Sequence, residues 1–177
     1  MKIVVYCAST MGNDEKYAKI TEKLGMWIGL NHHTLVYGGG KSGLMGVVAD
    51  AVLQTGGEVI GVLPDNKEIL SRKHPSLSTY YYVKNLAQRK EKMIDLADAF
   101  IALPGGPGTL DEISDVIALH RVHEIEKPIV LYDVDGFYQT LKQFYKEMKE
   151  KEFLNTSDID CVLFSENLEE ICKFITK

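Results

Sequence analysis

The segment with the clearest chemical potential is residues 104–109, with the sequence PGGPGT, which follows a short apolar run. Glycines let backbone amides approach a bound group closely, and amides at the start of a helix bind phosphate well. Glu112 comes three residues after Thr109, and we place it on the first turn of a helix that Thr109 caps. A carboxylate beside a phosphorylated sugar can stabilise an oxocarbenium-like transition state or activate water. The residues that we expect to bind phosphate here are Gly105, Gly106, Gly108 and Thr109.

A basic segment offers a partner for this acid. The sequence NLAQRKEK, which begins at Asn85, opens another expected helix, with Asn85 as its N-cap and Gln88 as the capping partner. Arg89 and Lys90 then fall in the first turns, where positive charge opposes the helix dipole. A bound anion would offset that charge. We therefore expect Arg89 and Lys90 to bind substrate, with Arg89 contacting phosphate, ribose hydroxyls or Glu112.

Both charged residues also have purely structural alternatives. Thr109 and Glu112 match a capping box, in which the Glu112 side chain only bonds the Thr109 amide. Arg89 would belong to a solvated basic face if it paired with Glu91 or Asp95 on its own helix. Spacing alone leaves both alternatives open.

A second glycine-rich segment, residues 38–43 with the sequence GGGKSG, follows an expected strand and opens a helix. It matches the GxGxxG pattern, so Gly40 and Gly43 are candidate substrate-binding residues. The dinucleotide fingerprint is incomplete, because Glu58 stands at the start of the next strand instead of its far end. A P-loop is excluded, because Leu35 occupies the position of its first glycine. The structural alternative is a tight turn that lets strand and helix pack closely.

These segments lie between apolar runs that alternate with helix-like stretches. The expected strands are residues 3–7, 34–37, 59–63, 80–83, 99–103, 129–132 and 161–164. The expected helices are residues 14–30, 44–53, 86–96, 110–122, 137–150 and 168–175, with residues 65–78 irregular. This alternation predicts an α/β fold in one domain, residues 1–177: a doubly wound, Rossmann-like parallel sheet with helices on both faces. Ligands of such folds bind beyond the carboxyl ends of the strands, where both glycine segments fall, and Ser9 completes the predicted substrate-binding set.

Composition limits the classes of function. The chain has 177 residues and a formal net charge of -5, which argues against a general nucleic-acid binder. Its three cysteines form no close pair, so we expect inert thiols in a reducing cytoplasm. No stretch reaches the roughly 18 apolar residues of a membrane helix, and no signal peptide is visible, so we expect a soluble protein. We predict no metal site, because His120 and His123 form a surface pair with too few ligands.

Taken together, these segments resemble the LONELY GUY (LOG) family of cytokinin-activating phosphoribohydrolases, often labelled "lysine decarboxylase". The matching segments are YGGGKSGLMG from Tyr37, RK at Arg89 with Met93, ADAFIAL from Ala97, PGGxGTxxE from Pro104, KP at Lys127 and GFY at Gly136. The resemblance covers roughly residues 2–153. It implies cleavage of a nucleoside 5'-monophosphate into base and ribose 5-phosphate by a dimer without a metal or organic cofactor. It also implies that Arg89 and Glu112 are the catalytic residues.

The chain departs from the family pattern mostly around the expected ligand. The differing positions are Leu86-Ala87, Arg72-Lys73, Pro107 and Ala118-Leu119. The resemblance therefore predicts the phosphate and sugar chemistry and leaves the base open between AMP and an N6-substituted AMP such as a cytokinin nucleotide. Three other functions stay open: a non-catalytic nucleotide or cofactor carrier, a pyridoxal-phosphate decarboxylase and an NAD(P)-dependent oxidoreductase. Product formation, a yellow cofactor and nicotinamide binding, respectively, would reveal them.

Overall fold

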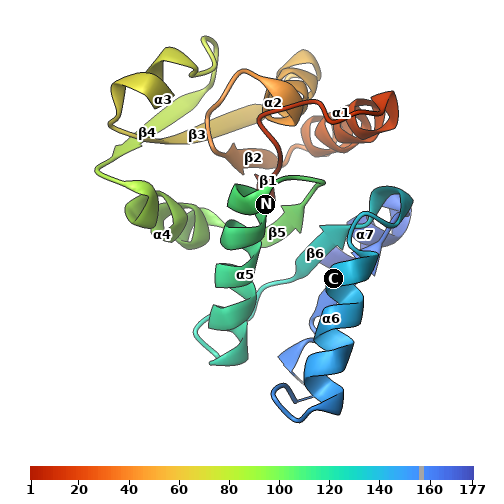
Figure 1. Cartoon of the computed structure of the whole chain (residues 1–177). Helices are drawn as coiled ribbons and strands as arrows, with labels where there is room; N and C mark the ends of the chain where they lie inside the picture. Colours follow the sequence, from red (N-terminus) through yellow and green to blue (C-terminus); the bar gives the residue numbers. More distant parts are fainter. Residues whose placement is uncertain (156–157) are drawn as a thin grey trace.

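The computed structural model describes residues 1–155 and 158–177, and its centre is one sheet of parallel strands (Figure 1). The strands are β1 Lys2–Tyr6, β2 Thr34–Tyr37, β3 Glu58–Pro64, β4 Thr79–Val83, β5 Ala99–Ala102, β6 Ile129–Tyr132 and β7 Val162–Ser165. Their order across the sheet is β4-β3-β2-β1-β5-β6-β7. The order reverses between β1 and β5, which is where open α/β sheets bind their ligands.

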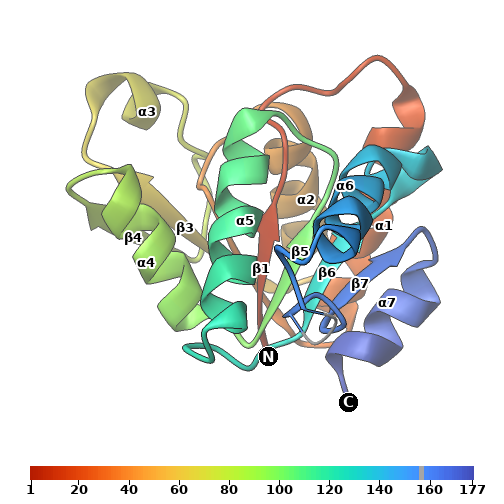
Figure 2. The same ribbon diagram turned by 60° about the horizontal axis from the view of Figure 1, so that its bottom comes forward.

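Helices cover both faces of this sheet, as predicted for a doubly wound fold. The helices are α1 Glu15–Leu30, α2 Gly43–Gln54, α3 Lys67–Ser71, α4 Leu86–Leu96, α5 Pro107–Arg121, α6 Gln139–Glu150 and α7 Leu168–Ile175, with a 3-10 turn at Val134–Gly136. One core contains residues of α1, α2 and α7, and the other contains residues of α4, α5 and α6. Figure 2 shows α5 in front of β1 and β5, with α2 behind them. The predicted α/β fold is confirmed.

Alternation along the strands explains the two cores. In β1, Ile3 and Val5 face the α1–α2 side, whereas Val4 and Tyr6 face the α4–α5 side. All four side chains are at most 1% exposed. Strands that are buried on both faces read as continuous apolar runs, which is why the sequence located them well.

Several element boundaries differ from the sequence prediction by one to three residues, and one short helix was not predicted. Residues 65–78 were expected to be irregular, but Lys67–Ser71 forms α3, whose N-cap Asn66 accepts hydrogen bonds from the two amides that follow Lys67. Helix α5 begins at Pro107 and not at residue 110. Proline suits the first helical position because its missing N–H would have no partner there.

Candidate active site

The two predicted catalytic residues meet across α4 and α5. Arg89 Nη2 lies 3.2 Å from Glu112 Oε1, and the two side chains are only 18% and 10% exposed. Arg89 is therefore not part of a solvated face paired with Glu91 or Asp95. The helices bring together an acid and a base that are 23 positions apart in the chain, on the side of the sheet that contains Tyr6.

The surroundings of Glu112 favour its protonated form more than solvent water would. Burial raises the pKa of Glu112 above its ordinary value of 4.5, the Arg89 guanidinium works against this rise, and Asp111 adds to it. The largest contribution is burial, because the charged form loses hydration. A carboxyl group whose pKa is moved toward neutrality suits general acid–base work.

The capping box predicted as an alternative for Glu112 is wrong. The N-cap of α5 is Gly106, which makes no side-chain cap, and Thr109 is the third residue inside the helix. Glu112 therefore lies on the second turn, where it cannot bond the amide of an N-cap at Thr109. The sequence prediction placed Thr109 as the N-cap because threonine prefers that position, but Pro107 starts the helix earlier.

The start of α5 presents free backbone amides. The backbone hydrogen bonds of the described residues leave the Gly108 and Thr109 amides without a backbone acceptor, and the next amide, Leu110 N–H, donates to Gly106 O at 3.1 Å. The Thr109 side chain folds onto Gly105, where an added Cβ would lie 2.1 Å from Thr109 Oγ1. Added Cβ atoms at Gly106 and Gly108 would meet nothing within 4 Å. This arrangement leaves two amides free at the positive end of a helix, a geometry that suits an anion.

The glycine segment at residues 38–43 has a different geometry. The first two amides inside α2 after Gly43 are occupied, because Leu44 N–H donates to Thr10 O and Met45 N–H to Ala8 O, both at 3.2 Å. Gly43 has φ +62°, and an added Cβ would lie 2.2 Å from the carbonyl carbon of Ser9. Gly43 is therefore the contact that brings the loop after β1 against α2. Its binding role, like that of Ser9, stays a prediction.

Of the other glycines of this segment, Gly38 packs against Arg89, and Gly40 contacts Tyr37 and Met45. An added Cβ at Gly38 would lie 1.9 Å from Arg89 Nη2, so only glycine leaves room for this guanidinium. Gly40 accepts a hydrogen bond from Tyr37 Oη at 3.1 Å, and an added Cβ there would lie 2.8 Å from Met45 Cε. Substrate binding by Gly40 stays a prediction.

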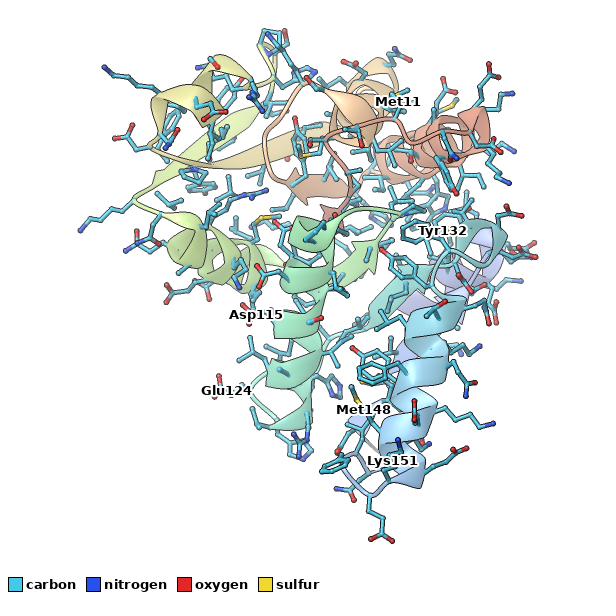
Figure 3. All side chains as sticks on the ribbon, viewed as in Figure 1. Met11, Asp115, Glu124, Tyr132, Met148 and Lys151 are labelled. Carbon is cyan, nitrogen blue, oxygen red and sulfur yellow. The ribbon has the colours of Figure 1, made fainter. Side chains whose placement is uncertain are left out.

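Lys90 joins α4 to α5. Its Nζ lies 3.1 Å from Asp111 Oδ1 and 2.9 Å from Asp115 Oδ2, and hydrogen bonding to Asp115 raises the pKa of Lys90. Figure 3 labels Asp115 on α5. The predicted N-cap at Asn85 is confirmed, because its side chain accepts from Gln88 N–H at 2.9 Å. The structure thus gives Lys90 a helix-joining contact, and its predicted contact with substrate stays a prediction.

A cavity of about 260 Å³ lies beside the start of α5, at the point where the strand order reverses. Thr10 and Tyr17 line it from the segments after β1, and Gly105, Gly106 and Phe137 line it from the other side. The free helix start and this cavity share Gly105 and Gly106. Within the described ranges, no group of three or more His, Cys, Asp or Glu side chains could hold a metal ion.

The sequence analysis missed two polar residues near the site, Tyr6 and His74. Tyr6 Oη and Arg89 Nε are buried without a hydrogen-bond partner within the part of the chain that the structure describes. The Glu112 carboxylate contributes to raising the pKa of the Tyr6 phenol, after burial itself, which places the two groups within electrostatic reach. His74 is 5% exposed and bonds the turn that carries Gly38 and its neighbours. A tyrosine at a strand end and a histidine in a polar segment gave no signal that could have identified them.

Comparisons with known proteins find relatives over most of the chain. The profile of a family described as "Possible lysine decarboxylase" matches residues 45–175. The cytokinin riboside 5'-monophosphate phosphoribohydrolase LOG4 of Arabidopsis thaliana is 37% identical over 97% of this chain and 80% of its own length. The cytokinin riboside 5'-monophosphate phosphoribohydrolase of Rhodococcoides fascians is 34% identical over 94% of this chain and 85% of its own length.

Solved structures share the fold at lower identity. The molybdenum cofactor binding protein of Rippkaea orientalis superimposes with a TM-score of 0.74 at 20% identity, over 99% of this chain and 97% of that one. The molybdenum cofactor carrier protein of Chlamydomonas reinhardtii has a TM-score of 0.73 at 18% identity, over 99% and 98% of the two chains. At this identity the likeness shows the fold alone. The match to the family profile and the identity to the phosphoribohydrolases show that this chain belongs to the LONELY GUY (LOG) family.

Proposed function

We propose that this protein hydrolyses the N-glycosidic bond of a nucleoside 5'-monophosphate to give the free base and ribose 5-phosphate. The substrate is AMP or an N6-substituted AMP such as a cytokinin nucleotide. The observation that carries the proposal is the buried ion pair of Arg89 and Glu112 beside a helix start with free amides. Relatives at 34% to 37% identity that are named for this reaction support it.

The phosphate binds at the start of α5. The Gly108 and Thr109 amides point their dipoles at the 5'-phosphate, and the helix adds its positive end. Gly105 and Gly106 bring the backbone close, because neither carries a side chain between the loop and the ligand. Arg89 orients the phosphate or ribose and offsets the negative charge that the nucleotide brings near Glu112.

Glu112 acts on the sugar. Its carboxylate stabilises the positive charge that develops at C1', or takes the proton of the water that attacks there. Water forms the new C1'–O bond, the C1'–N9 bond breaks, and its electron pair leaves with the base, which takes up a proton. The low exposure of the pair strengthens this electrostatic stabilisation relative to a site in open water.

The test is product chromatography after incubation with AMP and with isopentenyl-adenosine monophosphate. We expect free base and ribose 5-phosphate from wild-type protein, and a loss of about 100-fold or more in Glu112→Gln with nucleotide affinity largely retained. Glu22→Gln, on an exposed face of α1, is the matched control and should keep wild-type turnover. Full turnover in Glu112→Gln would refute the role of Glu112, and binding without cleavage by the wild type would identify a carrier.

We also propose that the protein is a cytoplasmic homodimer. The exposed apolar residues Leu86 on α4 and Leu110 on α5, 57% and 45% exposed, support an interface between copies. Free thiols at Cys7, Cys161 and Cys172 support a reducing compartment. The net charge of -5 supports the absence of a nucleic-acid partner. In the described part of the chain, no helix is long and apolar enough to cross a membrane.

A further inference from the structure

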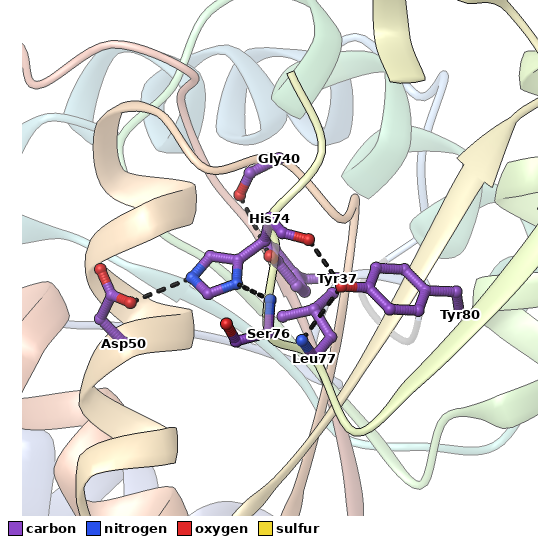
Figure 4. Close-up of polar contacts among 7 residues, drawn as sticks. All are labelled: Tyr37, Gly40, Asp50, His74, Ser76, Leu77 and Tyr80. Carbon is purple, nitrogen blue, oxygen red and sulfur yellow. Dashed lines mark hydrogen bonds and ion pairs between the residues drawn. The ribbon is translucent and has the colours of Figure 1, made fainter. Parts of the chain in front are cut away.

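A second polar network lies beside the glycine segment at residues 38–43 and takes no part in the chemistry proposed above (Figure 4). At its centre is His74, which is 5% exposed. His74 Nε2 lies 3.0 Å from Asp50 Oδ1 on α2, and His74 Nδ1 accepts a hydrogen bond from Ser76 N–H at 3.2 Å. Because Nδ1 is an acceptor, Nε2 carries the ring proton and donates it to Asp50.

The backbone of the same segment pairs with the glycine turn. We call residues 72–77 the strap and residues 38–41 the glycine turn. The bonds between them are His74 N–H to Gly39 O at 2.8 Å, Lys41 N–H to Arg72 O at 3.0 Å, and an antiparallel bridge between Gly40 and Lys73. The strap therefore adds a short edge to the turn, and His74 contributes both a backbone bond to the turn and a side-chain bond to α2.

Tyr80 fixes the other end of the strap. Its hydroxyl donates to His74 O at 2.6 Å and accepts from Leu77 N–H at 3.1 Å. The ring, the amide and the carbonyl of His74 are thus all bonded, each to a different part of the molecule. Asp50 is 59% exposed, but His74 at the centre is buried with its polar groups bonded, and such a residue favours one arrangement of the groups around it.

The glycine turn packs against Arg89. Gly38 precedes the Gly39 carbonyl that His74 bonds, and the Gly38 backbone packs against Arg89 Nη2 so closely that an added Cβ would lie 1.9 Å from that nitrogen. The same Nη2 pairs with Glu112 Oε1 at 3.2 Å. A shift of the turn would therefore shift the nitrogen that contacts the proposed catalytic carboxylate.

We propose that His74 is a positioning residue that clasps the strap to the glycine turn and so fixes the guanidinium of Arg89 against Glu112. The effect on turnover rests on the proposed hydrolysis, whereas the clasp itself does not. An ångström-scale misplacement of a catalytic group lowers turnover with little effect on substrate affinity, so the expected signature is a change in kcat and not in KM.

The experiment compares His74→Ala with His74→Gln. Alanine removes the ring bonds to Asp50 and Ser76, whereas the glutamine amide nitrogen reaches the position of Nε2 and can still donate to Asp50. The control is Ile171→Val, a buried change on α7, far along the sheet from the turn, that lowers thermal stability without touching the strap. The readouts are kcat and KM for AMP per folded molecule, and hydrogen exchange of the Lys41 amide.

We expect His74→Ala to lower kcat about tenfold with KM within about twofold, and His74→Gln to recover most of the loss. The Lys41 amide should exchange at least about tenfold faster in His74→Ala than in the control. A kcat in His74→Ala equal to that of Ile171→Val, or no recovery in His74→Gln, would overturn the positioning role. If the wild type cleaves no nucleotide, the proposed hydrolysis fails, and unchanged exchange at Lys41 would separately overturn the clasp.

Discussion

Glu112 is a carboxylic acid that is almost enclosed and forms an ion pair with Arg89. Burial raises its pKa above 4.5, and the ionised form is the one that the proposed mechanism uses. We therefore expect kcat/KM to rise with pH through a pKa above 4.5, in a pH–rate profile from about pH 4 to about pH 8. A plateau that is already complete at pH 4.5 would contradict this assignment.

The same pKa also makes folding depend on pH. The folded state binds the Glu112 proton more tightly than the unfolded state does. The stability that this group contributes is therefore fully present below the unfolded pKa and is lost as pH rises through the folded pKa. We expect the melting temperature of wild-type protein, relative to Glu112→Gln, to fall as pH rises from 4.5. Parallel curves for the two proteins would show that Glu112 is ionised as easily as in water.

The buried hydroxyl of Tyr6 can be tested through its effect on stability. Its ring stacks on Phe100, with centroids 6.3 Å apart, while its buried hydroxyl has no partner among the described residues. Tyr6→Phe keeps the ring and removes the unsatisfied group, so we expect a gain of about 1 kcal/mol in the free energy of unfolding. Urea denaturation measures this gain. A loss of stability would mean that the hydroxyl has a partner in solution, and Tyr132→Phe is a comparison variant in which the hydroxyl is less deeply buried.

At this scale, sequence identified the two residues of the catalytic pair but not their supports. Arg89 and Glu112 stand in motifs whose spacing indicates their chemistry. The bond of His74 to Asp50 joins positions 24 apart, and Tyr6 lies in the chain 106 positions before Glu112, so neither relation is visible as local spacing.

Helix α5 carries the next level of organisation, because its first turn is the proposed phosphate site. Gly108 lies inside the helix with open space around its missing Cβ. Gly108→Ala should stabilise the protein by about 0.5 kcal/mol, since alanine is the better helix former. The new methyl group would stand where the phosphate approaches, so we expect weaker AMP binding by about tenfold at the same time.

Calorimetry of unfolding and of AMP binding on the same variant separates the two effects. Ala51→Gly on α2 reverses the helix-propensity change away from the site and should lower stability without changing affinity, apart from the lost fraction of folded protein. Unchanged AMP affinity in Gly108→Ala would place the phosphate elsewhere.

Sequence predicted the helix boundaries less well than the helices themselves. The start of α5 was misplaced by three residues, because Pro107 was interpreted as part of a loop when it fits the first helical position. Helix α3 was missed because five residues are too few for a periodic apolar pattern, and none of them is buried.

For the whole molecule, the parallel sheet and its two helical layers could be predicted, because every strand is a short apolar run between helical segments. The order of the strands could not, because it depends on which strand pairs with β1 and thus on contacts far apart in the chain. The pairing of β1 with β5 matters most, since it places the loops after both strands at one cleft.

That residues 1–177 form one domain stays a prediction, and it can be tested. One sheet and two cores that share β1 lead us to expect a single cooperative unfolding transition. Circular dichroism and the fluorescence of Trp27 on α1 should report the same midpoint in urea. Two separated midpoints would divide the chain into independent units. Midpoints that rise with protein concentration would also support the proposed homodimer.

The occupied amides at the start of α2 have a directional consequence. Helices α2 and α5 both begin near the cleft. The carbonyls of Ala8 and Thr10 occupy two of the first amides of α2, whereas the Gly108 and Thr109 amides of α5 have no backbone acceptor among the described residues, so we expect the anion to bind at α5. With its phosphate at α5, a nucleotide would have one electrostatic anchor, so we expect it to bind in one orientation. We therefore expect a larger or smaller base to be accommodated without moving the sugar that reacts.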